Sequence, residues 1–249
     1  MANATLLPLA GRVAFVTGAG QGLGAAMAQA LAQAGARVAL ADVALDLVEA
    51  VAAPLGGLAL RLDVRDEAAF QGAFDAALAH FGAVDILVNN AARTPTTSLW
   101  DITPEEWDDV LAVNLRGSFF GCRIAGRHMR ERGAGRIVNL ASMAGQQPSS
   151  VTGAHYAASK AALLALTRSF AQELAPHGVT VNAVAPAAIG SPALDALDPA
   201  RRQALQAGIP LGRFGLPQEV AAAVVYLASP AAAFMTGATL DLNGGRFMR

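Results

Sequence analysis

Tyr156 and Lys160 are the residues whose types and spacing most directly predict chemistry in this chain. They lie in the stretch HYAASKAALLALTRSFAQEL, which reads as a helix. Residues four apart on a helix share one face. A phenol, with an ordinary pKa of about 10, is a poor base at neutral pH. An opposite charge nearby can lower such a pKa by about 1–3 units, so Lys160, joined by a second positive charge in the site, would make Tyr156 a usable base.

A hydroxyl group is expected beside this pair. The apolar run GRIVNLAS ends in Ser142, and the helix that carries Tyr156 is the next helical stretch in the chain. Ligands of parallel sheets bind at the carboxyl ends of the strands. We therefore expect Ser142 to hold a substrate oxygen, Tyr156 to exchange a proton with it, and a cofactor to supply the hydride. A lone tyrosine and lysine at this spacing are often a plain surface pair, so the surrounding motifs must show whether this pair is catalytic.

A glycine-rich stretch near the N-terminus predicts a dinucleotide site. TGAGQGLG, residues 17–24, follows the apolar run RVAFV and precedes a helical pattern. Exposed amides at a helix N-terminus, together with the helix dipole, bind phosphate. The strict G-x-G-x-x-G spacing is not met, because Gly20-x-Gly22-x-x-Ala25 fits only its looser form. A flexible hairpin is the alternative interpretation.

Asp42 favours NAD over NADP. It ends the second strand predicted by the sequence, 24 residues past Gly18. A carboxylate there accepts hydrogen bonds from the adenosine ribose and repels a 2′-phosphate. Position 21 is Gln rather than Arg or Lys, so the loop offers no cation for that phosphate. Asp42 could instead be the N-cap of the segment that follows.

Short apolar runs alternate with alanine-rich helical runs along the whole chain. Several runs are apolar at consecutive positions, as strands covered on both faces are. The pattern predicts an α/β fold in which a doubly wound, Rossmann-like parallel sheet of about seven strands has helices on both faces. We expect a single domain over residues 1–249. The expected strands are 12–17, 37–42, 58–64, 85–91, 135–142, 179–186 and 238–245, and the clearest helices are 25–35 and 68–82.

Composition excludes several classes of protein. Of 249 residues, 54% are apolar and 15% charged, and the net charge is −1. Disorder needs the opposite balance, and nucleic-acid binding needs a basic stripe that is absent. The longest apolar stretches fall short of a membrane span, and the N-terminus lacks the basic region of a secretory signal. The histidines do not reach metal-ligand spacing, so we expect no metal, and the single cysteine suits a cytoplasmic protein.

Seven motifs occur in order at plausible intervals, and together they resemble the classical short-chain dehydrogenase/reductase family over nearly the whole chain. This resemblance implies a nicotinamide-dependent oxidoreductase. It also implies a homotetramer built through paired long helices, here residues 105–132 and the helix of Tyr156. The motifs are TGAGQGLG, LDV with Asp63, NNAA at 89–92, VNLRG with Asn114, Ser142, YAASK and NAVAP at 182–186.

The resemblance also implies roles for individual residues. Asn114, Ser142, Tyr156 and Lys160 would be catalytic, with Asn114 holding a water in a proton relay from Lys160 to solvent. Asp63 would bind the adenine amino group. The implied cofactor-binding residues are Gly18, Gln21, Gly22, Leu23, Gly24, Asp42, Val43, Asp63, Val64, Asn90, Ala91, Ala92, Tyr156, Lys160, Pro186 and Ile189.

The chain departs from the family pattern around the nicotinamide end. Ala92 and Ala187 replace glycines, and Ser191 stands where threonine is common. Ser142 and Tyr156 are 14 residues apart, one more than is usual, which predicts a one-residue bulge in the loop between them. None of these changes removes a catalytic group, but they alter the shape expected for the pocket.

Other segments give weaker expectations. Residues 187–210 would form a substrate lid, and their small and apolar residues predict a neutral substrate. Thr103 and Pro104 look like the cap and first residue of a helix. We expect His155 to lie at the rim of the site, and Trp100 and Trp107 to pack.

Three functions fit these residues. The first is an NAD-dependent oxidoreductase that interconverts a secondary alcohol and a ketone. The second is a 3-oxoacyl-thioester reductase, which the run IPLGRFGLP resembles. That activity usually uses NADPH, and Asp42 disfavours it. The third is a non-catalytic nucleotide-binding protein, which the presence of both Tyr156 and Lys160 disfavours.

Overall fold

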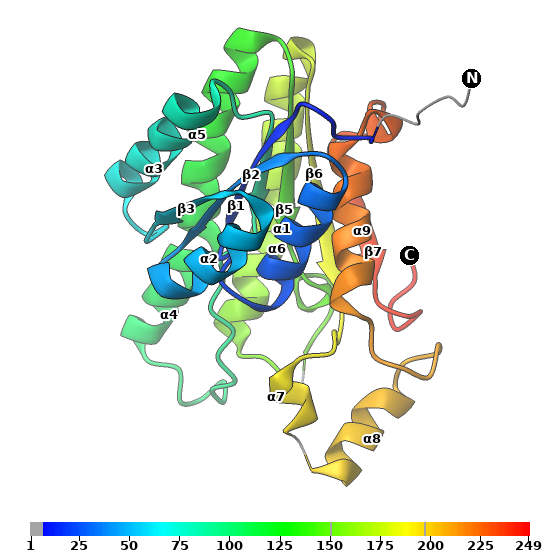
Figure 1. Ribbon diagram of the computed structural model, residues 1–249. Coiled ribbons are helices and arrows are strands. Elements are labelled where there is room, and N and C mark those ends of the chain that lie inside the picture. Colours follow the sequence, from blue (N-terminus) through cyan, green and yellow to red (C-terminus); the bar gives the residue numbers. More distant parts are fainter. Residues whose placement is uncertain (1–6, 150, 197) are drawn as a thin grey trace, which may run out of the picture.

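A computed structural model describes residues 7–149, 151–196 and 198–249. Its centre is a parallel sheet in the order β3-β2-β1-β4-β5-β6-β7 (Figure 1). Chain order reverses between β1 and β4, so the crevice for a ligand is expected at the carboxyl ends of these two strands. The strands are β1 Val13–Thr17, β2 Arg37–Asp42, β3 Leu58–Arg61, β4 Ile86–Asn89, β5 Gly135–Leu140, β6 Val179–Pro186 and β7 Thr239–Leu242.

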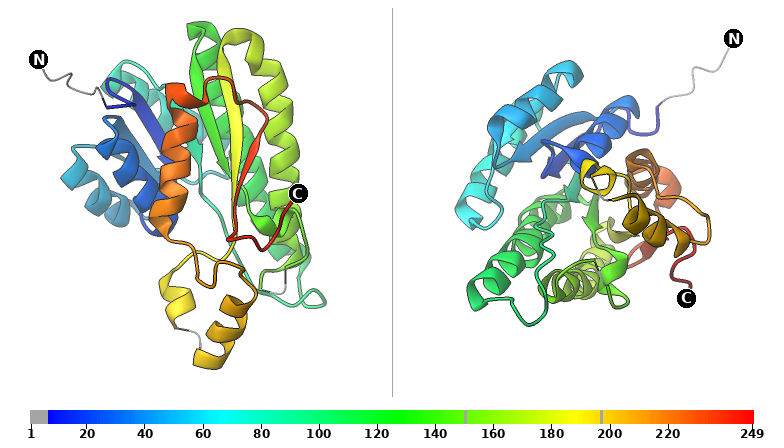
Figure 2. Two further views of the ribbon diagram at one scale, coloured as in Figure 1. Left: turned by 90° about the vertical axis from the view of Figure 1, so that its right-hand side faces the viewer. Right: turned by 90° about the horizontal axis from the view of Figure 1, so that it is seen from below.

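Helices cover both faces of the sheet (Figure 2, left). One core cluster unites the sheet with α1, α2 and α9, and a second unites the opposite face with α3, α5 and α6. The helices are α1 Gly22–Gln33, α2 Leu45–Ala52, α3 Glu67–Phe81, α4 Pro104–Leu111, α5 Gly117–Arg132, α6 Ala154–Leu174, α7 Pro192–Asp195, α8 Pro199–Ala207 and α9 Pro217–Ala228.

Strand β1 shows why the predicted strands are continuously apolar. Its side chains alternate between the two faces, as in any strand. Val13 and Phe15 enter the α3 and α5 core, whereas Ala14 and Val16 enter the α1 and α9 core. All four are fully buried. Both faces of this central strand are therefore covered, which confirms the doubly wound arrangement.

Local capping signals mark the ends of α3 and α4, and the expected helix start at Thr103 and Pro104 is confirmed. Helix α3 begins after Asp66, whose carboxylate accepts hydrogen bonds from the amides of Ala68 and Ala69, and it ends at Gly82 with φ +82°. Helix α4 begins with Thr103 capping the amide of Glu106 and with Pro at the first helical position. Across the described ranges, no helix is both long and apolar enough to span a bilayer.

Candidate active site

A cleft of about 830 Å³ lies along the carboxyl ends of the strands. Every cofactor-binding residue expected from the sequence lines it. So does Ser142, whereas Asn114 does not. The cleft thus brings together residues from segments that are distant in the sequence, from Gly18 to Ile189, at the place where the strand order reverses.

The glycine-rich loop forms a close-fitting turn of bare backbone at one end of the cleft. Gly18 has φ +64°, and a Cβ there would lie 2.8 Å from the Cα of Ala91. A Cβ on Gly24 would overlap the carbonyl oxygen of Gly18. Helix α1 begins at Gly22 without a side-chain cap and without an acidic residue in its first turn. Its first amides are therefore free to bind an anion, and the cradle fits a pyrophosphate.

Asp42 occupies the carboxyl end of β2 and lines the same end of the cleft. Its carboxylate accepts hydrogen bonds from the amides of Gly20 at 3.0 Å and Ala44 at 3.1 Å. The residue directly before α2 is Ala44, so Asp42 is not the N-cap of that helix. A carboxylate has about four acceptor positions, so these two bonds leave it able to accept from a ribose.

Asp63 is held by a cation that the sequence analysis missed. Arg65 binds its carboxylate at 2.6 Å and keeps the pKa of Asp63 below its ordinary value. Arg65 also pairs with Asp109 of α4, and Arg93 pairs with the same carboxylate. Arg65 and Arg93 both line the cleft. Arg65 directly follows the motif LDV, and Arg93 directly follows the motif NNAA. Their position next to these motifs was the signal that could have identified them.

Ser142, Tyr156 and Lys160 meet at the other end of the cleft. Ser142 follows β5, and its hydroxyl accepts a hydrogen bond from the amide of Ala144 at 3.1 Å. Tyr156 and Lys160 project from the first turns of α6 into the cleft. The Lys160 ammonium lies 5.7 Å from the centre of the Tyr156 ring and donates to the carbonyl of Leu140 at 2.6 Å.

Burial controls the protonation of this group. It raises the pKa of Tyr156, although the hydroxyls of Ser142 and Thr94 act in the opposite direction. It also lowers the pKa of Lys160 to about 8. The Lys160 ammonium is directed at the Leu140 carbonyl, so the expected lowering of the Tyr156 pKa by Lys160 together with the positive ring of a bound cofactor stays a prediction. Thr94, which lines the cleft, was not identified from the sequence.

Asn114 lies behind the cleft in a π-helical turn, Ala112–Arg116, that joins α4 to α5. The sequence analysis expected one long helix here. The Asn114 side chain is fully buried, accepts a hydrogen bond from the amide of Arg93 at 2.8 Å, and donates to the carbonyl of Arg93 at 3.0 Å. It therefore fixes the backbone of the segment that follows β4.

Two expectations about neighbouring residues are wrong. His155 does not lie at the rim: its side chain is fully buried, with its ring stacked on Trp107 at 6.5 Å. The first turn of α6 packs against α4, which covers the residue before Tyr156. Trp100 does not pack, since it is 90% exposed on the segment leading to α4.

Residues 187–210 contain α7 and α8, which project beyond the carboxyl edge of the sheet (Figures 1 and 2). The segment is anchored at its base, where the amide of Gly190 donates to the carbonyl of Gly215 at 2.8 Å. Ser191 lines the cleft beside Ile189. The bulge expected between Ser142 and Tyr156 includes Ser150, which lies outside the described residues.

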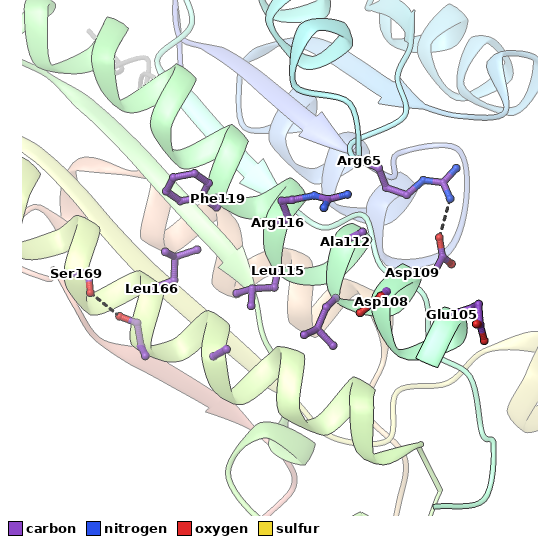
Figure 3. Close-up of a pocket in the computed structure, with 13 residues that line it drawn as sticks. Arg65, Glu105, Asp108, Asp109, Ala112, Leu115, Arg116, Phe119, Leu166 and Ser169 are labelled. Carbon is purple, nitrogen blue, oxygen red and sulfur yellow. Dashed lines mark hydrogen bonds and ion pairs between the residues drawn. The ribbon is translucent and has the colours of Figure 1, made fainter. Parts of the chain in front are cut away.

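A second groove, of about 1020 Å³, lies away from this chemistry between α4, α5 and the outer face of α6 (Figure 3). Leu115, Phe119 and Leu166 line one part of it, and the other part is charged, with Arg65 paired to Asp109.

Comparisons with known proteins identify the family. A family model described as "Enoyl-(Acyl carrier protein) reductase" matches residues 18–246. The chain is 42% identical over 243 residues to D-threitol dehydrogenase of Mycolicibacterium smegmatis, covering 95% of this chain and 93% of that protein. It is 41% identical over 242 residues to 3-oxoacyl-(acyl-carrier-protein) reductase FabG of Vibrio cholerae, covering 96% and 99%.

A solved structure agrees with these relatives. It is a short-chain type dehydrogenase/reductase from Mycobacterium marinum, with a TM-score of 0.90, 37% sequence identity and 98% coverage of both chains. The fold, the ordered motifs and the relatives are consistent with one another. This chain belongs to the short-chain dehydrogenase/reductase family, whose members are oxidoreductases that use NAD or NADP.

Proposed function

We propose that this protein is an NAD-dependent oxidoreductase that interconverts a secondary alcohol and a ketone. The observation that carries the proposal is the distribution of groups along one cleft. Asp42 and the bare amides of α1 line one part, and Ser142, Tyr156 and Lys160 line another. The first set suits a dinucleotide without a 2′-phosphate, and the second suits proton exchange with a substrate oxygen.

The chain's own groups would act as follows. Ser142 donates a hydrogen bond to the substrate oxygen and orients it toward the phenol. Tyr156 takes the alcohol proton during oxidation and returns it during reduction. NAD, when bound, supplies the hydride acceptor, and its positive ring contributes the charge that favours the phenolate. Lys160 holds the nicotinamide ribose, and a water on the backbone of Asn114 continues the proton path to solvent.

The π-helical turn supports that last role. Turns of this kind disturb the regular backbone pairing and often occur at functional sites. The Asn114 carbonyl accepts the Ser118 hydroxyl at 2.9 Å, and a carbonyl oxygen has a second lone pair that can accept from a water. The carboxamide of Asn114 is engaged elsewhere, so the backbone oxygen is the group available for the relay.

A 3-oxoacyl-thioester reductase is the second candidate. Its support is the similarity to FabG of Vibrio cholerae, which is nearly as high as the similarity to D-threitol dehydrogenase. Asp42 argues against this candidate, because such reductases usually use NADPH and the carboxylate would repel its 2′-phosphate. Ala187 and Ile189, which are small or apolar and line the cleft, support a neutral substrate in either case.

Initial rates with four combinations of reactants separate the two. NADH and NADPH are each tested with a 3-oxoacyl thioester and with a panel of simple ketones, including aryl ketones and hydroxyketones, followed by chiral analysis of the products. We expect kcat/KM to be higher with NADH than with NADPH, and higher for a ketone of the panel than for the thioester. Preferred turnover of the thioester with NADPH would replace the first function with the second.

A further inference from the structure

The Asn114 side chain joins three segments of the chain through one carboxamide. Its oxygen accepts from the amide of Arg93 at 2.8 Å, and its nitrogen donates to the Arg93 carbonyl and to the Ser159 hydroxyl, both at 3.0 Å. An amide nitrogen carries two donor hydrogens, so both are used. Loss of either acceptor, the Arg93 carbonyl or the Ser159 hydroxyl, leaves a buried N–H group of Asn114 unpaired.

Ser159 is the member of this group that reaches the catalytic helix. Its side chain is fully buried and does not line the cleft. The hydroxyl accepts from Asn114 and donates to the backbone carbonyl of Tyr156 at 2.7 Å. One oxygen atom thus links the π-helical turn to the turn of α6 that carries Tyr156 and Lys160.

Removing that hydroxyl has an unequal effect on its two partners. The Tyr156 carbonyl keeps the partner that the helix itself provides. The Asn114 nitrogen keeps only the Arg93 carbonyl, so one of its two hydrogens is left buried without an acceptor, which is unfavourable. The carboxamide must then rotate or shift, which moves the Arg93 backbone beneath the cleft or the backbone carbonyl of Asn114. Either movement changes the geometry around Tyr156.

We propose that Ser159 is a positioning residue, which sets Tyr156 and Lys160 relative to the Asn114 turn through this two-bond link. The proposal rests on the function proposed above, because it assigns Ser159 an effect on the proton-transfer groups. Ser159 touches neither substrate nor cofactor. Its loss should therefore lower the turnover number and change its pH dependence, while binding of the cofactor is kept.

The chain offers a matched control. Ser229 is also buried, and its hydroxyl donates to the carbonyl of Tyr226, three residues earlier, at 2.8 Å. This is the same local bond that Ser159 makes to Tyr156. Ser229 follows α9, and its neighbours Ala228 and Pro230 line a pocket at the amino ends of β4 and β5, whereas the cleft lies at the carboxyl ends of the strands. Ser229→Ala therefore removes a similar hydroxyl from a similar environment without touching the site.

The test compares Ser159→Ala, Ser229→Ala and Tyr156→Phe in the full chain. We expect Ser159→Ala to lower kcat about tenfold, the equivalent of 1.4 kcal/mol in the barrier, with a shifted pH profile. The NADH dissociation constant, measured by fluorescence, should stay within twofold. Ser229→Ala should lower the melting temperature but leave kcat and its pH profile unchanged. If Ser159→Ala, like Ser229→Ala, leaves kcat and its pH profile unchanged, Ser159 is only structural and the proposal is wrong.

A second pair covers the case in which Ser159→Ala does not fold. Ser159→Thr and Ser159→Val add similar volume and differ in the hydroxyl. We expect the Thr variant to turn over about tenfold faster than the Val variant, and equal rates would overturn the proposal. Tyr156→Phe distinguishes failure of the Ser159 proposal from failure of the proposed function. If the Phe variant keeps wild-type turnover, the proton-transfer role itself is wrong, whatever Ser159 does.

Discussion

Lys160 is the only lysine in the sequence, and its side chain is 2% exposed. Burial lowers its pKa from 10.5 to about 8, so at neutral pH the fold holds a buried ammonium. Because the chain contains one lysine, ε-carbon-labelled lysine gives a single side-chain NMR resonance. We predict that this resonance titrates near pH 8 in the folded protein without cofactor. Titration above pH 10 would contradict the burial of this charge.

The same burial predicts the stability of a variant without the charge. Below pH 8 Lys160 is protonated in both states, so the folded state carries the full cost of the buried ammonium. Between pH 8 and about 10.5 the folded state loses its proton first, and the cost disappears. Lys160→Met should therefore stabilise the apoprotein most below pH 8, by at most about 3 kcal/mol. It should also abolish turnover. Denaturant unfolding at pH 7 and pH 10.5 measures this, and a larger gain at the higher pH would contradict it.

Asp42 tests the cofactor preference. Asp42→Asn keeps an oxygen for the amide of Gly20 or Ala44 but removes the charge that repels a 2′-phosphate. We expect the ratio of kcat/KM for NADPH to that for NADH to rise at least about tenfold, which corresponds to 1.4 kcal/mol. Steady-state kinetics with both cofactors gives this ratio. An unchanged ratio would mean that another feature sets the preference.

For individual residues, the sequence identified the catalytic side chains but not all the side chains that line the cleft with them. Ser142, Tyr156 and Lys160 follow from strand and helix register, and the structure places them in one cleft with the predicted glycine loop. Arg65, Arg93 and Thr94 were missed because side-chain contacts across loops depend on packing that spacing does not encode.

The loop before α1 provides a prediction for an element. A Cβ on Gly24 would overlap the Gly18 carbonyl, whereas Gly72 in α3 is exposed and has open space around it. Gly24→Ala should therefore distort the loop, weaken NADH binding and destabilise the fold. Gly72→Ala should stabilise the protein by about 0.5–1 kcal/mol, the helix preference for alanine. Melting temperatures and NADH titrations compare the two, and a harmless Gly24→Ala would refute the tight cradle.

The lid proposed for residues 187–210 gives a second test at this scale. Helices α7 and α8 project from the sheet edge and are anchored at the Gly190–Gly215 contact. If they close over bound reactants, amide hydrogen exchange in 187–210 should slow on addition of NADH with a non-reacting substrate analogue. Exchange in α3 should not change. Equal exchange with and without ligands would argue against a lid.

For elements, the sequence predicted most of the fold. The bounds of β2 and β6 match the predicted apolar runs, and the start of α4 matches the predicted cap at Thr103 and Pro104. The π-helical turn at Ala112–Arg116 was missed, because its residues are compatible with an uninterrupted helix. The Asn114 side chain lies in this turn and bonds to Arg93 and Ser159.

For the whole molecule, the second groove supports the proposal of a homotetramer. It exposes Leu115, Phe119 and Leu166 between helices expected to pair with those of another subunit. We expect a mass of four chains by light scattering coupled to gel filtration. Leu166→Arg should reduce the mass, while Leu99→Arg, at a 62% exposed residue outside the groove, should not. A monomeric wild-type protein would contradict this proposal.

The central claim is that Tyr156 transfers the proton at the end of the cofactor cleft. The most direct test is single-turnover kinetics of Tyr156→Phe, with NADH bound and a ketone that the wild type reduces. General acid catalysis contributes about 10²–10⁴-fold to such a step. We predict a loss of at least 10²-fold in the rate of NADH oxidation, with the NADH dissociation constant within about threefold of wild type, roughly 0.6 kcal/mol. A rate equal to that of the wild type, with NADH bound equally well, would contradict the account.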